Sequence, residues 1–221
     1  MRPTLLANLS PAMVGRIKAL VFVLCLLPLA ASLWQALSGQ AVNPVETLTR
    51  DSGSWALNLL LAGLAITPLR RLGAPGWLLR LRRMLGLYAF FYASVHLLIY
   101  LWLDQLFDWP AIVHDIIKRP FITVGMAAFA LLLPLAITST DGWLRRLKRR
   151  WSQLHRLVYP LAVLAVVHYL WLVKRDLTEP LLYSAVLALL LLVPSALTLL
   201  GLCSGATAIA RGPLPPTWIS S

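Results

Sequence analysis

Residues 82–103 read RRMLGLYAFFYASVHLLIYLWL, in which two arginines precede a run of twenty residues without Asp, Glu, Lys or Arg. As a helix that rises about 1.5 Å per residue, this run crosses the roughly 30 Å hydrocarbon core of a bilayer. It therefore predicts a transmembrane helix that has basic residues at one end and one ionisable side chain, His96, inside it.

Similar apolar runs recur along the chain. The 221 residues are 59% hydrophobic and 13% charged, with a mean hydropathy of +0.77, which is more apolar surface than one soluble core of this size can bury. The first run is longer than the core of a signal peptide and is followed by others, so we interpret it as a span. The predicted spans are 17–37, 55–69, 84–103, 121–138, 154–173 and 181–202.

The expected fold class is all-α, a polytopic membrane helix bundle of about six transmembrane helices. Residues 17–202 would form the membrane domain, 1–16 a cytoplasmic N-terminal segment and 203–221 a short cytoplasmic tail. No domain is expected after the last span. The lipid bilayer is therefore the first partner that the sequence predicts.

The distribution of charge indicates an orientation. Basic residues are retained on the cytoplasmic side of membrane proteins. With both termini in the cytoplasm, the inner segments hold fifteen Lys and Arg against one acid, Asp141. The outer loops then hold five basic residues against seven acids: Glu46, Asp51, Asp104, Asp108, Asp115, Asp176 and Glu179. The net charge is +12, but the charged residues lie between apolar segments and are explained by membrane topology. We therefore predict no nucleic-acid partner.

Two histidines share a predicted depth. His96 lies thirteen residues after Arg83, and His168 lies thirteen residues after His155, which opens the fifth span. Each interval is about 20 Å of helix, so His96 and His168 would meet in the outer half. Two neutral imidazoles at one height are suitable axial ligands for a heme iron. The alternative is that each is an isolated buried histidine bonded to a neighbouring carbonyl.

The inner site is less complete. His155 belongs to the inner half, where no second histidine exists, and Arg82 and Arg83 could meet heme propionates or a flavin phosphate there. On a straight helix, thirteen residues rotate by roughly 220°, so His155 and His168 would not share a face. A kink or wide turn near Pro160 could change that phase.

The remaining motifs limit the chemistry. His114, in HDIIKRP, is interpreted as a solvated loop residue. Cys25 and Cys203 lie in apolar segments without CxxCH spacing, so any heme would be non-covalent. No GxGxxG, P-loop, GxSxG or HExxH motif occurs. Electrons would therefore arrive from one molecule and leave to another.

In order and spacing, several segments resemble the MsrQ (YedZ) family of the ferric-reductase-like transmembrane group. They are ITPLRR (66–71), RRMLGL (82–87), His96, KRPFITVG (118–125), ITST (137–140), WSQLHRLVYP (151–160) and HYLWLVK (168–174). The resemblance implies a multi-pass protein of the bacterial inner membrane that carries heme b, one or two, with His96, His155 and His168 as iron ligands.

The resemblance also implies partners. They are a periplasmic molybdenum-containing reductase, MsrP, as electron acceptor, and the quinone pool or a cytoplasmic flavin reductase as donor. FMN is associated with the family, but no residue here matches an FMN or quinone motif. The chain would be an electron-transfer subunit rather than an enzyme, and we expect MsrP to dock on the acidic segments 104–115 and 176–179. A ferric reductase or other cytochrome b subunit, and a cofactor-free transporter or structural protein, remain alternatives.

Overall fold

The computed structural model describes residues 10–173 and 177–199, and all its regular structure within these ranges is helical. The expected tail at 203–221, Cys203, Asp176 and most of the segment 1–16 lie outside them. The long helices are α1 (Pro11–Leu37), α2 (Pro44–Arg71), α3 (Leu79–Ile99), α5 (Pro120–Ile137), α8 (Val158–Leu172) and α9 (Thr178–Leu199). The short helices are α4 (Trp109–Lys118), α6 (Asp141–Leu147) and α7 (Arg149–Leu154).

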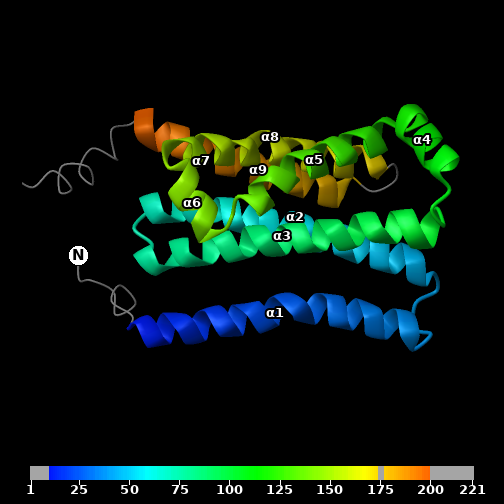
Figure 1. The fold of residues 1–221 in the computed structure, drawn as a ribbon, viewed down its shortest axis with the longest axis horizontal. Helices are drawn as coiled ribbons and strands as arrows, with labels where there is room; N and C mark the ends of the chain where they lie inside the picture. Colours follow the sequence, from blue (N-terminus) through cyan, green and yellow to red (C-terminus); the bar gives the residue numbers. More distant parts are fainter. Residues whose placement is uncertain (1–9, 174–176, 200–221) are drawn as a thin grey trace, which may run out of the picture.

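The long helices run along one common axis, with α4 at one end and α6 toward the other (Figure 1). We call these the α4 end and the α6 end. Among the described residues, five helical stretches are long and apolar enough to cross a membrane: 12–37, 44–71, 76–104, 120–137 and 149–172. The described apolar part of α9, Thr178–Val193, is shorter. The predicted all-α polytopic membrane bundle is confirmed.

The second span begins much earlier than predicted. We placed its start at Trp55, but α2 begins at Pro44, where the Asn43 side chain accepts a hydrogen bond from the Glu46 N–H at 3.2 Å. Hydropathy excluded the first three turns because they carry Glu46, Arg50 and Asp51. The cap and the proline after it start the helix despite these charges. Asp51, expected in a loop, therefore lies on a helix.

A tyrosine bridges the proline turn of α1. Pro28 lies inside α1, where a membrane helix is normally repaired by a neighbouring group. The Tyr92 hydroxyl from α3 accepts a hydrogen bond from the Leu29 N–H at 3.2 Å and donates one to the Cys25 carbonyl at 2.7 Å. Tyr92 is 1% exposed. The same side chain thus ties α1 to α3.

Replacing Tyr92 with phenylalanine should weaken the bundle. The variant keeps the ring but loses the two hydrogen bonds that the hydroxyl makes to α1, and each such bond contributes about 0.5–1.5 kcal/mol. Thermal unfolding in detergent, followed by circular dichroism, measures the effect. Tyr159 of α8 is exposed, and Tyr159→Phe is the matched control. An equal loss of stability in both variants would contradict the bridging role of Tyr92.

Candidate functional site

His96 of α3 and His168 of α8 meet near the α4 end of the bundle. Their ring centroids are 6.3 Å apart, and the two ring planes are 83° from parallel. His96 lies one turn before a π-helical turn, Tyr100–Asp104, that ends the third span. The depth match inferred from sequence therefore corresponds to a real juxtaposition of two imidazoles from separate helices.

Backbone carbonyls hold both rings through the same nitrogen. His96 Nδ1 lies 2.8 Å from the Thr49 carbonyl oxygen, and His168 Nδ1 lies 2.6 Å from the Phe121 carbonyl oxygen. A carbonyl only accepts, so each Nδ1 carries the proton, and Nε2 of the neutral ring carries a lone pair. Such second-shell bonds are typical of metal-ligating histidines. The alternative prediction, that each buried histidine bonds a neighbouring carbonyl, also describes these contacts. The bonds still leave Nε2 of each ring for a ligand.

Two glycines make room for these rings. A Cβ on Gly53 of α2 would lie 3.0 Å from His96 Cε1 and Nδ1. A Cβ on Gly125 of α5 would lie 2.8 Å from His168 Nδ1. Sequence reasoning missed both glycines as site residues, although Gly125 closes the segment KRPFITVG. Each ring is therefore fixed on one side by a carbonyl and on another by a close backbone.

Gly125→Ala should displace His168 and lower the cofactor content severalfold. The added methyl group cannot share the space of the ring, and overpacking of this kind costs about 1–3 kcal/mol. Absorbance of the purified protein per mole of chain measures the result. Gly86→Ala in α3 is the matched control, because a Cβ there meets nothing within 4 Å. If both alanine variants kept full absorbance, Gly125 would have no role in placing the ring.

The paired rings fit a heme better than a bare metal ion. A metal–imidazole bond is about 2 Å long and the ring adds roughly 1 Å on each side, so two rings on one metal have centroids roughly 6 Å apart. Within residues 10–173 and 177–199, no three His, Cys, Asp or Glu side chains gather as an ion site. Two axial nitrogens suffice only for a metal that brings its own equatorial ligands, as heme does.

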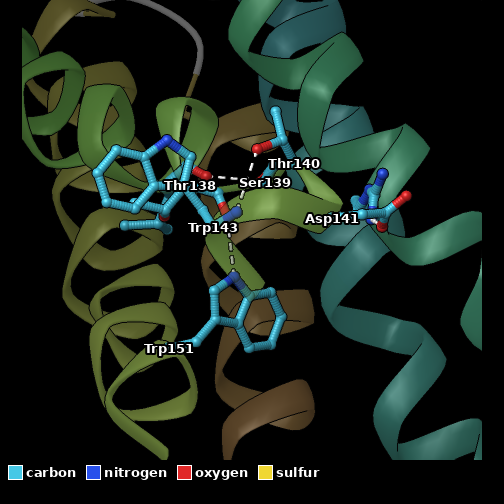
Figure 2. Close-up of polar contacts among 8 residues, drawn as sticks. Thr138, Ser139, Thr140, Asp141, Trp143 and Trp151 are labelled. Carbon is cyan, nitrogen blue, oxygen red and sulfur yellow. Dashed lines mark hydrogen bonds and ion pairs between the residues drawn. The ribbon is translucent and has the colours of Figure 1, made fainter. Parts of the chain in front are cut away.

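His155 occupies the α6 end and is held differently. It begins a 3-10 turn, His155–Leu157, between α7 and α8. Its Nδ1 donates to the Trp151 carbonyl at 3.1 Å, and its ring stacks on the Trp151 ring with centroids 3.8 Å apart. The Trp151 ring nitrogen in turn donates to the Thr138 carbonyl at 2.9 Å (Figure 2). His155 Nε2 is buried and has no hydrogen-bond partner.

The sequence of the chain matches known proteins over most of its length. Residues 52–166 match the family described as "Ferric reductase like transmembrane component". The chain is 54% identical over 181 residues to the "Protein-methionine-sulfoxide reductase heme-binding subunit MsrQ" of Xanthomonas campestris pv. campestris (strain 8004), covering 79% of this chain and 83% of the relative. The chain belongs to the MsrQ family.

Two further MsrQ relatives extend the match. The subunit of Azospira oryzae is 55% identical over 187 residues, with 82% of this chain and 79% of the relative covered. The subunit of Herminiimonas arsenicoxydans is 50% identical over 188 residues, with 83% and 86% covered. The matched residues 52–166 of the ferric-reductase-like family include His96 and His155 and end two residues before His168.

In this MsrQ-family chain the two candidate arginines have different surroundings. Arg83 pairs with Asp141 of α6, and both side chains are partly exposed. Figure 2 shows Asp141 turned away from Trp151. The Arg83 guanidinium holds the pKa of the Asp141 carboxyl below its usual value. Arg82 precedes Arg83 on α3, and no ion pair of its side chain occurs among the described residues.

A 3-10 turn changes part of the rotation between His155 and His168. The kink near Pro160 stays a prediction. Before Pro160, the chain tightens into the 3-10 turn that begins at His155. A 3-10 turn advances about 120° per residue instead of about 100°.

Thr67 Oγ1, in the same half of the bundle, is the other buried side-chain atom without a hydrogen-bond partner among the described residues. The α6 end therefore holds unsatisfied polar groups in an apolar bundle.

Two of the acidic residues expected on the outer side have partners within the protein. Asp115, expected on a docking surface, is 8% exposed and pairs with Arg119 at 3.2 Å. His114 is exposed, as expected, but lies on α4 rather than in a loop. Glu179 lies on α9, accepts a hydrogen bond from the Tyr169 hydroxyl at 2.7 Å and faces Arg50 at 3.9 Å. Asp115 and Glu179 are thus held by partners within the protein, whereas Asp104 and Asp108 are exposed. Docking of MsrP on these segments stays a prediction.

A polar cleft of about 460 Å³ is lined by residues of α2 and α9. It is lined by Thr47, Arg50, Asp51, Ser54, Glu179, Leu182 and Tyr183. The α2 residues that touch the His96 ring, Ser52 and Gly53, lie between these positions in sequence. Sequence reasoning missed this cleft because it placed Asp51 and Glu179 in separate loops. The cleft and the His96 site therefore use the same three turns of α2.

Proposed function

We propose that the chain is a heme b electron-transfer subunit of a protein-methionine-sulfoxide reductase system in the bacterial inner membrane. It would take electrons from the quinone pool or a cytoplasmic flavin reductase and pass them to a periplasmic molybdenum reductase, MsrP, that repairs oxidised methionine. The observation that carries the proposal is the pair His96 and His168, with rings 6.3 Å apart and each Nδ1 bonded to a carbonyl.

His96 and His168 would hold the iron of one heme through their Nε2 atoms. The carbonyls of Thr49 and Phe121 keep the rings in the tautomer that binds metal. Heme, when bound, supplies a one-electron carrier between the ferric and ferrous states. The protein supplies ligands, burial and orientation. With both termini in the cytoplasm, this pair would lie near the periplasmic face.

His155 would be the ligand of a second heme near the cytoplasmic face, or a relay to the first. Its buried, unpaired Nε2 supports this role, because a polar atom left unpaired in an apolar interior is costly. Arg82 would then face the heme propionates. The described residues offer no second histidine to this site. The family resemblance also implies FMN, but we assign no residue of this chain to an FMN site.

The chain would not itself convert a substrate. Its candidate site consists of metal-ligating imidazoles, and methionine sulfoxide reduction would take place on MsrP. The relatives' names support this division, since they describe a heme-binding subunit of a reductase.

A reduction assay tests the proposal against a ferric reductase. Purified, dithionite-reduced protein is mixed anaerobically with oxidised MsrP or with chelated ferric iron, and reoxidation of the heme bands is followed. We expect rapid electron transfer to MsrP and slow transfer to the chelate. The opposite preference would support the ferric reductase alternative, and a colourless preparation would support a cofactor-free membrane protein.

A further inference from the structure

The short helix α4 has three distinct sides. At about 100° per residue, Ile112, Asp115 and Arg119 fall on one side, and Ile112 and Asp115 are only 4% and 8% exposed. The neighbouring side carries Trp109, Val113 and Ile117, which are 60%, 53% and 72% exposed. The remaining side carries His114 and Lys118, both exposed. A protein-facing, an apolar and a polar side thus follow one another around the helix.

Exposed apolar side chains also lie on the segment between α3 and α4. At the last turn of the third span, Trp102 and Leu103 are 56% and 41% exposed. Leu106 and Phe107, which follow, are 77% and 44% exposed and lead directly to Trp109. Exposed apolar side chains therefore occur from the end of a membrane span to α4, with the exposed Asp104 and Asp108 between them. An apolar patch of this kind needs a cover.

The turn before α4 is built to present these side chains. Leu106 and Phe107 have φ values of 48° and 59°, a left-handed conformation that costs a residue with a Cβ about 1–2 kcal/mol. The Phe107 N–H donates to the Leu101 carbonyl at 2.8 Å, which holds the turn. Asp108 then caps α4 by accepting a hydrogen bond from the Ala111 N–H at 3.2 Å. The chain is thus forced to bend at the end of the span.

The underside of α4 connects to the paired histidines. Asp115 is held by Arg119 at the end of the helix. The Thr123 hydroxyl of α5 donates to the Ile116 carbonyl of α4. Thr123 lies two residues after Phe121, whose carbonyl accepts the hydrogen bond from His168. A displacement of α4 would therefore act on the backbone that positions the His168 ring.

We infer that α4 lies in the lipid–water interface, with Trp109, Val113 and Ile117 against the lipid acyl chains and with His114 and Lys118 toward water. The order of the three sides matches a helix that lies in the membrane plane beside a bundle. Tryptophan and lysine are typical of this boundary. The bilayer thereby anchors the segment that holds the Phe121 carbonyl. This placement depends on the membrane fold and not on the cofactor.

Spin labels at neighbouring positions test the inference. Single cysteines at Val113→Cys, Ile117→Cys and His114→Cys are placed in a Cys25→Ala, Cys203→Ser background, labelled with a nitroxide and reconstituted in vesicles of phosphatidylethanolamine and phosphatidylglycerol. Collision with molecular oxygen, which concentrates in lipid, is compared with collision with aqueous nickel-EDDA. We expect oxygen to dominate at 113 and 117, and nickel-EDDA to dominate at 114.

Two results would overturn the inference. Equal access of nickel-EDDA to positions 113, 114 and 117 would mean that the apolar side faces water and awaits a protein. Protection of 113 and 117 from both reagents would mean that a second copy or another protein covers it. The far-ultraviolet circular dichroism of each labelled variant, compared with that of the unlabelled background, shows that the bundle is intact.

Discussion

Replacing His168 or His96 with alanine should remove most of the heme that we propose to bind between α3 and α8. Each ring would provide one nitrogen to the heme iron, and even loss of a second-shell partner typically lowers metal affinity about 10–100-fold. Loss of the ligand itself should cost at least as much. The measurement is the Soret band and the pyridine hemochrome content per mole of purified chain.

Two controls separate ligand loss from misfolding. His114→Ala changes an exposed histidine of α4 and should keep full heme content. Adding free imidazole to the His168→Ala variant should restore part of the Soret band, because a small ligand can occupy the space that the ring leaves. Unchanged spectra in both His96→Ala and His168→Ala would remove these residues from the site.

Replacing His155 with alanine should have the second-largest effect, and a different one. If His155 carries its own heme, the variant loses that heme while the His96–His168 heme keeps its spectrum, so the hemochrome content falls to about half. The buried Nε2 without a partner supports this outcome. The pyridine hemochrome assay combined with electron paramagnetic resonance of the oxidised protein distinguishes the two hemes.

The matched variant for His155 is Trp151→Phe. It keeps an aromatic ring for stacking but loses the hydrogen bond to the Thr138 carbonyl, so we expect the second heme to remain with a shifted resonance signal. A His155→Ala protein with unchanged heme content and unchanged spectra would show that His155 is neither a ligand nor a neighbour of a heme. A fall in electron transfer without heme loss would instead support its role as a relay.

The residues that determine the bundle can be read from the sequence. Apolar runs of about twenty residues have no stable place except lipid or a core too large for this chain. The equal spacing of Arg83 to His96 and of His155 to His168 predicted a shared depth, because helical rise is constant. The family resemblance predicted the same three histidines from the order of short segments.

Only the tertiary structure decided how these side chains are held. Any residue can supply a carbonyl, so no pattern indicates that Thr49 and Phe121 orient the rings. Gly53 and Gly125 are ordinary helix glycines until a neighbouring ring lies against them. The start of α2 at Pro44 depends on the Asn43 cap, and Asp115 is held by Arg119 four residues later; hydropathy measures neither contact. Helical rise is a local property, whereas the contacts of each ring depend on which helices pack together.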